Sequence, residues 1–234
     1  MQLALTERQR LLARTGEGSR MIDWVLVSNL ATALGTSLLA VATFVATRSA
    51  NRSARSAERA LLEGLRPILL PSNWSDPVQK VRYLEGKWLI VHGGRASVEI
   101  TDEAVYAAIS LRNVGSGLAV LHGWYIPDDP RGEPGEPSEF YRLTRDIYIP
   151  TTDPGFCQIA IRDPETEFSK RIRRHLATED QFVVDVLYSD AEGSQRVISR
   201  FLISRGPGEH AEDGDEYAVT VSRHWNLDLP APRT

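Results

Sequence analysis

Five histidines and a single cysteine are the side chains in this sequence best suited to hold a metal or to act as base and nucleophile. Zinc sites usually take two ligands from one short segment, and no two of these histidines lie that close in the chain. One cysteine also cannot complete a set of thiolates. The residues are His92, His122, His175, His210, His224 and Cys157. The sequence therefore predicts no metal site, with assembly from distant strands as the remaining alternative.

Cys157 is the candidate nucleophile by residue type. A reactive cysteine needs a nearby base and a positive environment, whereas Cys157 stands in the apolar stretch 156–161, where cysteine usually packs as a small hydrophobe. The chain also has no Gly-x-Ser-x-Gly elbow. We predict no catalytic residue and no cofactor. A pocket that contains an acid or base with a perturbed pKa near Cys157 or His122 would instead favour an enzyme.

Three other segments carry groups that bind ions in other proteins. The turn 115–117 (Gly-Ser-Gly) could cradle an anion, but a strand follows it rather than the helix of a phosphate loop, so a hairpin turn is favoured. Asp213 and Asp215 could bind Ca²⁺ weakly, but they lack the EF-hand spacing. The basic cluster at 170–174 could contact phosphates, although it also suits the negative end of a helix dipole, which we favour.

The clearest structural element in the sequence is an uncharged stretch over residues 24–47. A helix of this length spans about 36 Å, enough for a hydrocarbon core of about 30 Å. Its serine and threonine hydroxyls can bond back to their own helix, and Trp24 stands where an interfacial aromatic is favoured. We predict a polar leader over 1–20 and a transmembrane helix over 21–65 that continues into a juxtamembrane helix.

Two alternatives to a membrane span stay open. A cleaved signal peptide has an apolar region of about 7–15 residues, which is shorter than this one, although Ala40 and Ala42 could mimic a cleavage site. A buried helix of a soluble protein is less favoured, because no face of the stretch carries a charge.

Arginines flank the span on both sides, so the positive-inside rule decides its orientation only narrowly. The cluster after the span is denser, and the leader is diluted by Glu7, Glu17 and Asp23. The leader holds Arg8, Arg10, Arg14 and Arg20, and the other flank holds Arg48, Arg52, Arg55 and Arg59. We predict a cell-membrane protein whose C-terminal domain lies in the cytoplasm.

The four arginines after the span form what we call the arginine stripe: Arg48, Arg52, Arg55 and Arg59. Spacings of four, three and four place them on one face of a helix. An arginine near an anionic leaflet gains about 1 kcal/mol, so the stripe is a candidate site for lipid headgroups. The plainer interpretation, which we favour, is that it fixes topology and stays solvated. Gly64 and Pro67 are predicted to end this helix.

A second pattern runs through the same helix. Small or weakly polar residues recur at spacings of four and three, and we call them the small-residue seam: Asn29, Ala33, Thr36, Ala40 and Thr43. Small residues let helices approach closely in lipid, and the Asn29 amide can hydrogen-bond across an interface. The seam predicts a homo-oligomer formed through the transmembrane helix.

From residue 66 the period changes from helical to strand-like. Nine apolar runs are predicted as strands: 67–70, 88–92, 97–101, 104–112, 118–126, 156–161, 182–188, 197–204 and 217–222. In 104–112, apolar residues alternate with others as in a half-buried strand. Seven or more short strands with regular turns favour a mainly β fold, an immunoglobulin-like antiparallel β-sandwich over residues 66–225.

One helix is predicted within this domain, over 164–176, with Asp163 as N-cap and Pro164 as its first residue. The segments 128–139 and 206–216 are rich in proline, glycine and acid, so we predict exposed, mobile loops. Residues 226–234 have little to bury and are predicted to be a disordered tail.

Three short motifs resemble a family of uncharacterised actinobacterial single-pass membrane proteins with a C-terminal β-sandwich domain. They are the juxtamembrane stretch 52–72, the strand-turn-strand 111–119 and the strand end 186–190. Leu118 stands where that family has a small residue or proline. The resemblance implies the architecture from residue 24 to about 205 and implies no activity.

The net charge of −4 is too small to predict a nucleic-acid partner. Our leading hypothesis is a non-enzymatic interaction or scaffold module that the helix tethers to the lipid bilayer and that binds an unknown protein partner. The first alternative is an exported, envelope-facing sandwich on a signal anchor. The second is a membrane-bound enzyme of unknown class.

Overall fold

The computed structural model describes residues 3–178, 181–205 and 215–229, and it describes side chains from Trp24 onward, apart from those of Glu63 and Asp215. The chain folds as two compact units, Met1–Ala60 and Leu61–Thr234. We call the second unit the β domain. Its boundary lies before the predicted position at 65/66, because the last turn of the helix is bonded to the domain. The Gln195 side chain donates to the Leu62 carbonyl, and Arg66 Nε donates to Gln195 Oε1 at 2.9 Å.

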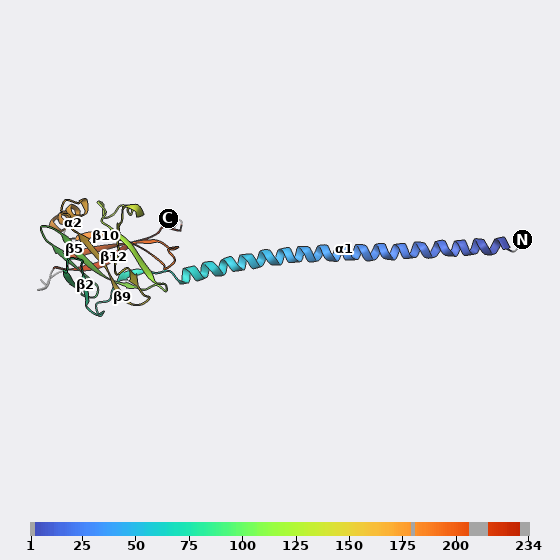
Figure 1. The fold of residues 1–234 in the computed structure, drawn as a ribbon, viewed down its shortest axis with the longest axis horizontal. Helices are drawn as coiled ribbons and strands as arrows, with labels where there is room; N and C mark the ends of the chain where they lie inside the picture. Colours follow the sequence, from blue (N-terminus) through green and yellow to red (C-terminus); the bar gives the residue numbers. More distant parts are fainter. Residues whose placement is uncertain (1–2, 179–180, 206–214, 230–234) are drawn as a thin grey trace. The chain divides into compact units, whose positions relative to one another are not determined.

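The first helix, α1 (Leu3–Gly64), is continuous, as Figure 1 shows. It includes most of the polar leader, which the sequence did not predict to be helical. It ends at Gly64 as predicted, and the Leu65 amide closes it by donating to the carbonyls of Leu61 and Leu62. Pro67 follows three residues after the end, where it cannot extend the helix.

The β domain is built on a ten-stranded antiparallel sheet, and the prediction of a mainly β fold is confirmed. The strand order is β1-β5-β4-β12-β11-β10-β6-β7, with β9 beside β5 and β8 beside β6. The strands of this sheet are β1 (Leu69–Pro71), β4 (Arg95–Ile100), β5 (Val105–Asn113), β6 (Ala119–Tyr125), β7 (Tyr141–Arg142), β8 (Tyr148–Ile149), β9 (Pro154–Ile161), β10 (Gln181–Ser189), β11 (Val197–Arg205) and β12 (Asp215–Asn226).

One main core joins the two ends of this strand order. Ile109 of β5, Ile159 of β9 and Trp124 of β6 belong to a single buried cluster with residues of β10, β11 and β12. The sheet therefore folds over on itself and encloses the core in a sandwich-like way. Ile172 of helix α2 (Glu167–Thr178) is fully buried in the same cluster and packs α2 onto the domain (Figure 1).

A two-stranded hairpin, β2 (Gln79–Arg82) and β3 (Trp88–Val91), forms a second, smaller core. Its buried residues Val81 and Leu89 cluster with Tyr106 and Ala108 of β5. The prediction that β5 is half-buried is therefore wrong, because the hairpin covers the face that we expected to meet solvent. Strand β2 was missed in the sequence because Val81 is its only apolar residue; β7 and β8 were missed because each has two residues.

Helix α2 begins three residues later than predicted. The Asp163 carboxylate accepts from the Glu165 amide at 2.9 Å and so organises a turn before the helix. Thr166 is the cap, since its hydroxyl accepts from the Ser169 amide at 3.3 Å.

The segment 128–139, predicted to be a mobile loop, is anchored to the sheet. Arg200 of β11 is fully buried beside Asp185 of β10, and its guanidinium donates to the carbonyls of Pro130, Gly132 and Glu133. A 3-10 helix, η1 (Pro137–Glu139), follows within the same segment. The sequence concealed this anchor because Arg200 and the loop are about 70 residues apart.

The first residues of the predicted tail, 226–229, are part of the described fold and bond to the β domain. Strand β12 continues to Asn226, which pairs with Val197, and Asp228 forms an ion pair with Arg196 at 2.7 Å. Residues 230–234 of the predicted tail, and 206–214 of the predicted acidic loop, lie outside the described residues.

Candidate functional site

One helix of the described chain is long and apolar enough to cross a membrane. Its large apolar side chains from Trp24 to Val45 are all more than half exposed within the single chain. The hydroxyls of the stretch bond back to carbonyls one turn earlier, as between Thr36 Oγ1 and the Thr32 carbonyl at 2.8 Å. These hydroxyls are thus satisfied without water.

Three residues of the arginine stripe, Arg48, Arg52 and Arg55, share one face of α1 with Phe44 and Thr47. All four stripe residues are exposed, and none forms an ion pair with another described residue. The residues of the predicted headgroup site therefore lie together on one exposed, basic face of α1, which is accessible to an anionic surface.

The small-residue seam also lies along one side of α1, because the helix is unbroken there. Thr36 and Thr43 turn their hydroxyls onto their own helix at 2.8 Å and so present only small surfaces. The Asn29 amide is exposed and has no hydrogen-bond partner in the described chain. It is the one member of the seam with a free hydrogen-bonding group to offer a neighbouring helix.

In the β domain, two histidines contact serine hydroxyls, an arrangement that resembles part of a hydrolase site. His122 Nε2 lies 2.8 Å from Ser189 Oγ, and His224 Nδ1 lies 2.6 Å from Ser199 Oγ. Burial lowers the pKa of both imidazoles, and nearby Arg142 lowers that of His122 further. Both serines are fully buried, and Ser189 donates its own hydrogen to the Asp190 carbonyl at 2.7 Å. Both serine hydroxyls lie inside the fold, whereas the His122 side chain is exposed and lines a pocket of about 320 Å³. A pocket with a perturbed base near His122, which would favour an enzyme, is therefore present, but the serine beside that base is buried.

Cys157 is fully buried in the main core, and burial raises the pKa of its thiol to about 12. At neutral pH it is a protonated, inaccessible thiol, as its apolar sequence context predicted. No group of three or more histidine, cysteine or acidic residues is placed to hold a metal in the described chain. His210 and Asp213 lie outside that part, and the Asp215 side chain is not described.

The turn 115–117 connects β5 to β6, but these two strands do not pair: β5 pairs with β1, β4 and β9, and β6 pairs with β10, β7 and β8. The predicted hairpin is therefore wrong, because the chain crosses here between distant strands of the folded sheet. The turn has no room for an anion because the chain before β1 fills the space. A Cβ on Gly117 would stand 1.8 Å from the Leu65 carbonyl oxygen, and one on Gly115 would stand 2.2 Å from that of Arg66. The buried Asn113 side chain holds the turn by accepting from the Gly115 amide and donating to the Gly117 carbonyl.

Most side chains of the basic cluster at 170–174 form contacts within the protein. Arg171 donates to the Ile126 carbonyl at 2.7 Å, Arg173 donates to the Thr101 carbonyl at 2.5 Å, and Lys170 pairs with Glu165. These bonds tie α2 to the chain around it and support the structural interpretation of the cluster.

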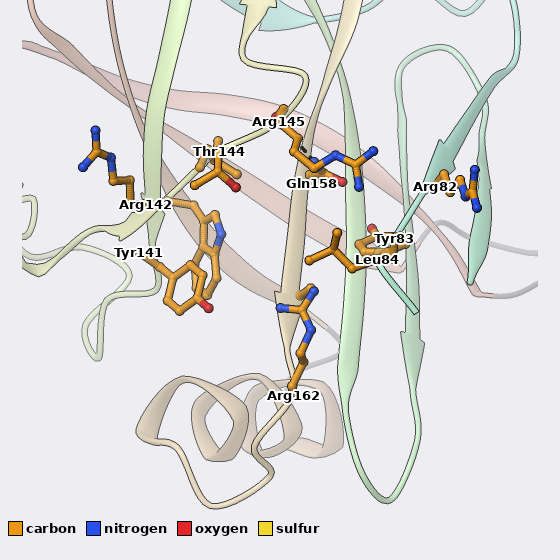
Figure 2. A pocket seen from close by; sticks show the side chains of 12 residues that line it. Arg82, Tyr83, Leu84, Tyr141, Arg142, Thr144, Arg145, Gln158 and Arg162 are labelled. Carbon is orange, nitrogen blue, oxygen red and sulfur yellow. Dashed lines mark hydrogen bonds between the residues drawn. The ribbon is translucent and has the colours of Figure 1, made fainter. Parts of the chain in front are cut away.

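A cleft in the β domain, with a volume of about 440 Å³, is a further candidate binding site. Figure 2 shows Tyr141 on one side, and Leu84 and Arg162 on the other. Arg145 and Gln158 stand at one end, where Gln158 Nε2 donates to the Arg145 carbonyl at 3.4 Å. The lining is completed by Arg82, Tyr83, Trp124, Arg142, Leu143, Thr144 and Ala160.

The walls of the cleft come from three separate parts of the fold. Tyr141 of β7 stacks on the buried Trp124 of β6 with ring centroids 4.9 Å apart, which fixes the aromatic wall. Ala160 and Arg162 come from β9 and the residue that follows it. Leu84 stands in the turn of the β2–β3 hairpin and is 70% exposed.

The charge of the cleft is positive. Four arginines line it and no acidic residue does. Arg162 is paired with Glu85, whose pKa the guanidinium holds below its usual value. Arg142 and Arg145 form no ion pair with any described residue. The cleft is thus suited to an anionic ligand with an apolar part that can pack on Tyr141.

No pattern in the sequence predicted this cleft. Its arginines are spread over 80 residues of chain, from Arg82 to Arg162, and none stands in a motif. Only the pairing of β6 with β7 and of β5 with β9 brings them to one place. The pair Arg142 and Arg145, flanking an exposed loop, was the one local signal.

We compared the chain with family models, curated proteins and solved structures, and none of them matches it.

Proposed function

We propose that this protein is a non-enzymatic interaction module that α1 tethers to the cell membrane, with its β domain in the cytoplasm. The observation that carries the proposal is the uncharged stretch of α1, whose apolar side chains are exposed and whose hydroxyls are bonded to the helix itself. Such a surface is costly in water and favourable in hydrocarbon. The arginine stripe directly after it supports the cytoplasmic orientation.

The β domain supports the interaction part of the proposal. It offers an open cleft with an aromatic wall and unpaired arginines, which are residue types enriched at binding hot spots. The serines of its two Ser–His contacts and its cysteine are fully buried. A homo-oligomer through the small-residue seam would present several such clefts at one membrane site, and lipid headgroups on the stripe would hold the domain near the leaflet.

Fusion of alkaline phosphatase and of a fluorescent protein, separately, after Thr234 tests membrane insertion and orientation together. We expect a membrane-fraction protein with fluorescence and no phosphatase activity. Phosphatase activity without fluorescence would favour the exported, envelope-facing alternative. A protein in the soluble fraction would refute the membrane tether.

A pair of charge variants sharpens this test. Changing the four arginines of the stripe to glutamine should raise phosphatase activity and lower fluorescence, because the stripe is proposed to hold the domain inside. The same change at Arg8, Arg10, Arg14 and Arg20 is the matched control and should leave the orientation unchanged. The reverse pattern would make the leader the topological anchor.

A further inference from the structure

The cleft lies between two strand edges that have no partner in the described chain. Strand β9 pairs with β5 along its whole length, from Pro154↔Arg112 to Ile161↔Val105, and with no other strand. The segment 141–149, on the opposite side of the cleft, pairs only with β6 through β7 and β8. Two edges of one sheet thus face each other across the opening.

The two edges meet at one end only. Gly155 at the start of β9 lies against Ile149 of β8, where a Cβ on Gly155 would stand 2.6 Å from the Ile149 side chain. Further along β9, the contact with Arg145 comes from a side chain: Gln158 Nε2, and not a backbone amide, donates to the Arg145 carbonyl. Beyond that point, toward Arg162, the cleft separates the edges. The sheet is therefore left open at the second half of β9.

An open antiparallel edge presents the N–H and C=O groups of alternate residues, which another extended chain can pair with. Strand addition of this kind takes its affinity from backbone bonds and its specificity from the side chains on either side of the added strand. On β9, Ile159 and Ile161 face the main core, while Gln158, Ala160 and Arg162 line the cleft from the other face, where Ala160 also packs against the second core. An added strand would find these two environments on its two faces.

The inner side of the opening is aromatic. Tyr141 is the register partner of the core residue Trp124, so it stands on the core side of the sheet, yet it remains 48% exposed because no strand covers it. An apolar side chain packed on Tyr141 would extend the main core. The outer side is basic, with Arg162 and Arg145 beside the edge and Arg82 on the flank of the cleft (Figure 2).

We propose that an extended, acidic segment of a partner protein adds to the open edge of β9 as an antiparallel strand. Alternate residues of the segment place carboxylates toward Arg145 and Arg162 and apolar side chains onto Tyr141. This inference deepens the proposed function, on which it rests, by naming the binding surface and the chemistry of the partner. The charge of the cleft selects an acidic occupant, and the unpaired backbone of β9 selects an extended one.

The test uses the full chain in phosphatidylcholine nanodiscs and a short capped peptide that alternates glutamate with valine, followed by fluorescence anisotropy. We expect saturable binding that Arg162→Ala and Arg145→Ala each weaken by about tenfold. Glu85→Gln should tighten binding, because it removes the carboxylate that competes for Arg162. Arg174→Ala, at an exposed position on α2, is the matched control and should not change the affinity.

Backbone pairing is tested separately from charge. The same peptide N-methylated at alternate residues, in both parities, keeps its carboxylates but loses the amide donors on one edge. We expect one parity to lose binding, and we expect the peptide to slow deuterium exchange of β9 amides. Equal binding of both N-methylated peptides would refute strand addition.

Charge alone and lipid binding are the competing outcomes. Equally tight binding of poly-glutamate, or displacement of the peptide by phosphatidylglycerol vesicles at matched charge, would overturn the proposal in favour of a nonspecific anion site or a headgroup site. The peptide reaches both faces of a nanodisc, so its binding does not depend on orientation. A failure here is therefore distinct from a failure of the topology experiment.

Discussion

The Arg200 guanidinium uses all five of its N–H groups inside the protein. Two bond to Asp185 at 2.7 and 2.8 Å, and the others reach the carbonyls of Pro130, Gly132 and Glu133. Burial raises the pKa of Asp185 while the guanidinium opposes that effect. A buried pair of this kind is strongly destabilising to break, because the remaining charge is left without a partner.

We expect Arg200→Ala to lower the unfolding free energy of the β domain by about 3–5 kcal/mol. The measurement is urea unfolding of the full chain followed by tryptophan fluorescence, with deuterium exchange of residues 128–136 as a second readout. Arg223→Ala is the control, since the guanidinium groups of Arg200 and Arg223 both lie over the Trp225 ring, at 4.8 and 5.8 Å, but Arg223 is exposed. An equally large loss of unfolding free energy in Arg223→Ala would show that breaking the buried pair is no more destabilising than removing an exposed arginine.

Cys157 allows a second prediction at the residue scale. With its thiol pKa raised to about 12 by burial, almost none of it is thiolate at pH 8, whereas a free cysteine is partly ionised there. We expect the folded protein to react with a disulfide reagent at pH 8 at least a hundredfold more slowly than glutathione. The rate should rise to the free-thiol value in denaturant. Because Cys157 is the only cysteine, fast labelling of the native chain would contradict the buried assignment directly.

At the scale of elements, the β5–β6 turn packs directly on the chain between α1 and β1. Gly117 has the shortest such approach, with the Leu65 carbonyl oxygen 1.8 Å from the position of a Cβ. A methyl group there must push one backbone segment away from the other.

We expect Gly117→Ala to destabilise the β domain by about 1–3 kcal/mol, the usual cost of forced overpacking. Denaturant unfolding of the full chain measures it. Gly132→Ala is the matched control, because its Cβ would stand no closer than 3.4 Å to any neighbour, which is ordinary contact. If the two variants unfold alike, the close approach of the turn to Leu65 is not a feature of the folded protein.

The hairpin β2–β3 explains why the prediction of a half-buried β5 was wrong. Alternation in β5 correctly identified the core face of Val105, Ala107 and Ile109, but alternation cannot say whether another element covers the second face. Tyr83 of the hairpin turn donates to the Ala107 carbonyl at 2.8 Å and packs edge-on to Tyr106 at 4.9 Å. These contacts link positions more than twenty residues apart, which no local pattern records.

For the whole molecule, association through α1 is the property most directly open to test. Thr36→Leu with Ala40→Leu should weaken self-association in a membrane two-hybrid assay, because bulky side chains keep the helices apart. Ala31→Leu with Ala42→Leu adds leucines on the opposite face of the helix and is the matched control. Equal association of the two double variants would remove the seam as an interface.

The sequence by itself determined the uncharged span, the arginine stripe, the end of α1 near Gly64 and Pro67, and most of the strands, because each depends on neighbours within a few residues. Only the tertiary structure decided the buried Arg200–Asp185 anchor, the second core under the hairpin, and the cleft. These depend on strand pairings such as β5 with β9 and β6 with β7, which join residues far apart in the chain. The physical reason is that hydropathy and period are local properties, whereas a binding site is made where distant edges and charges meet.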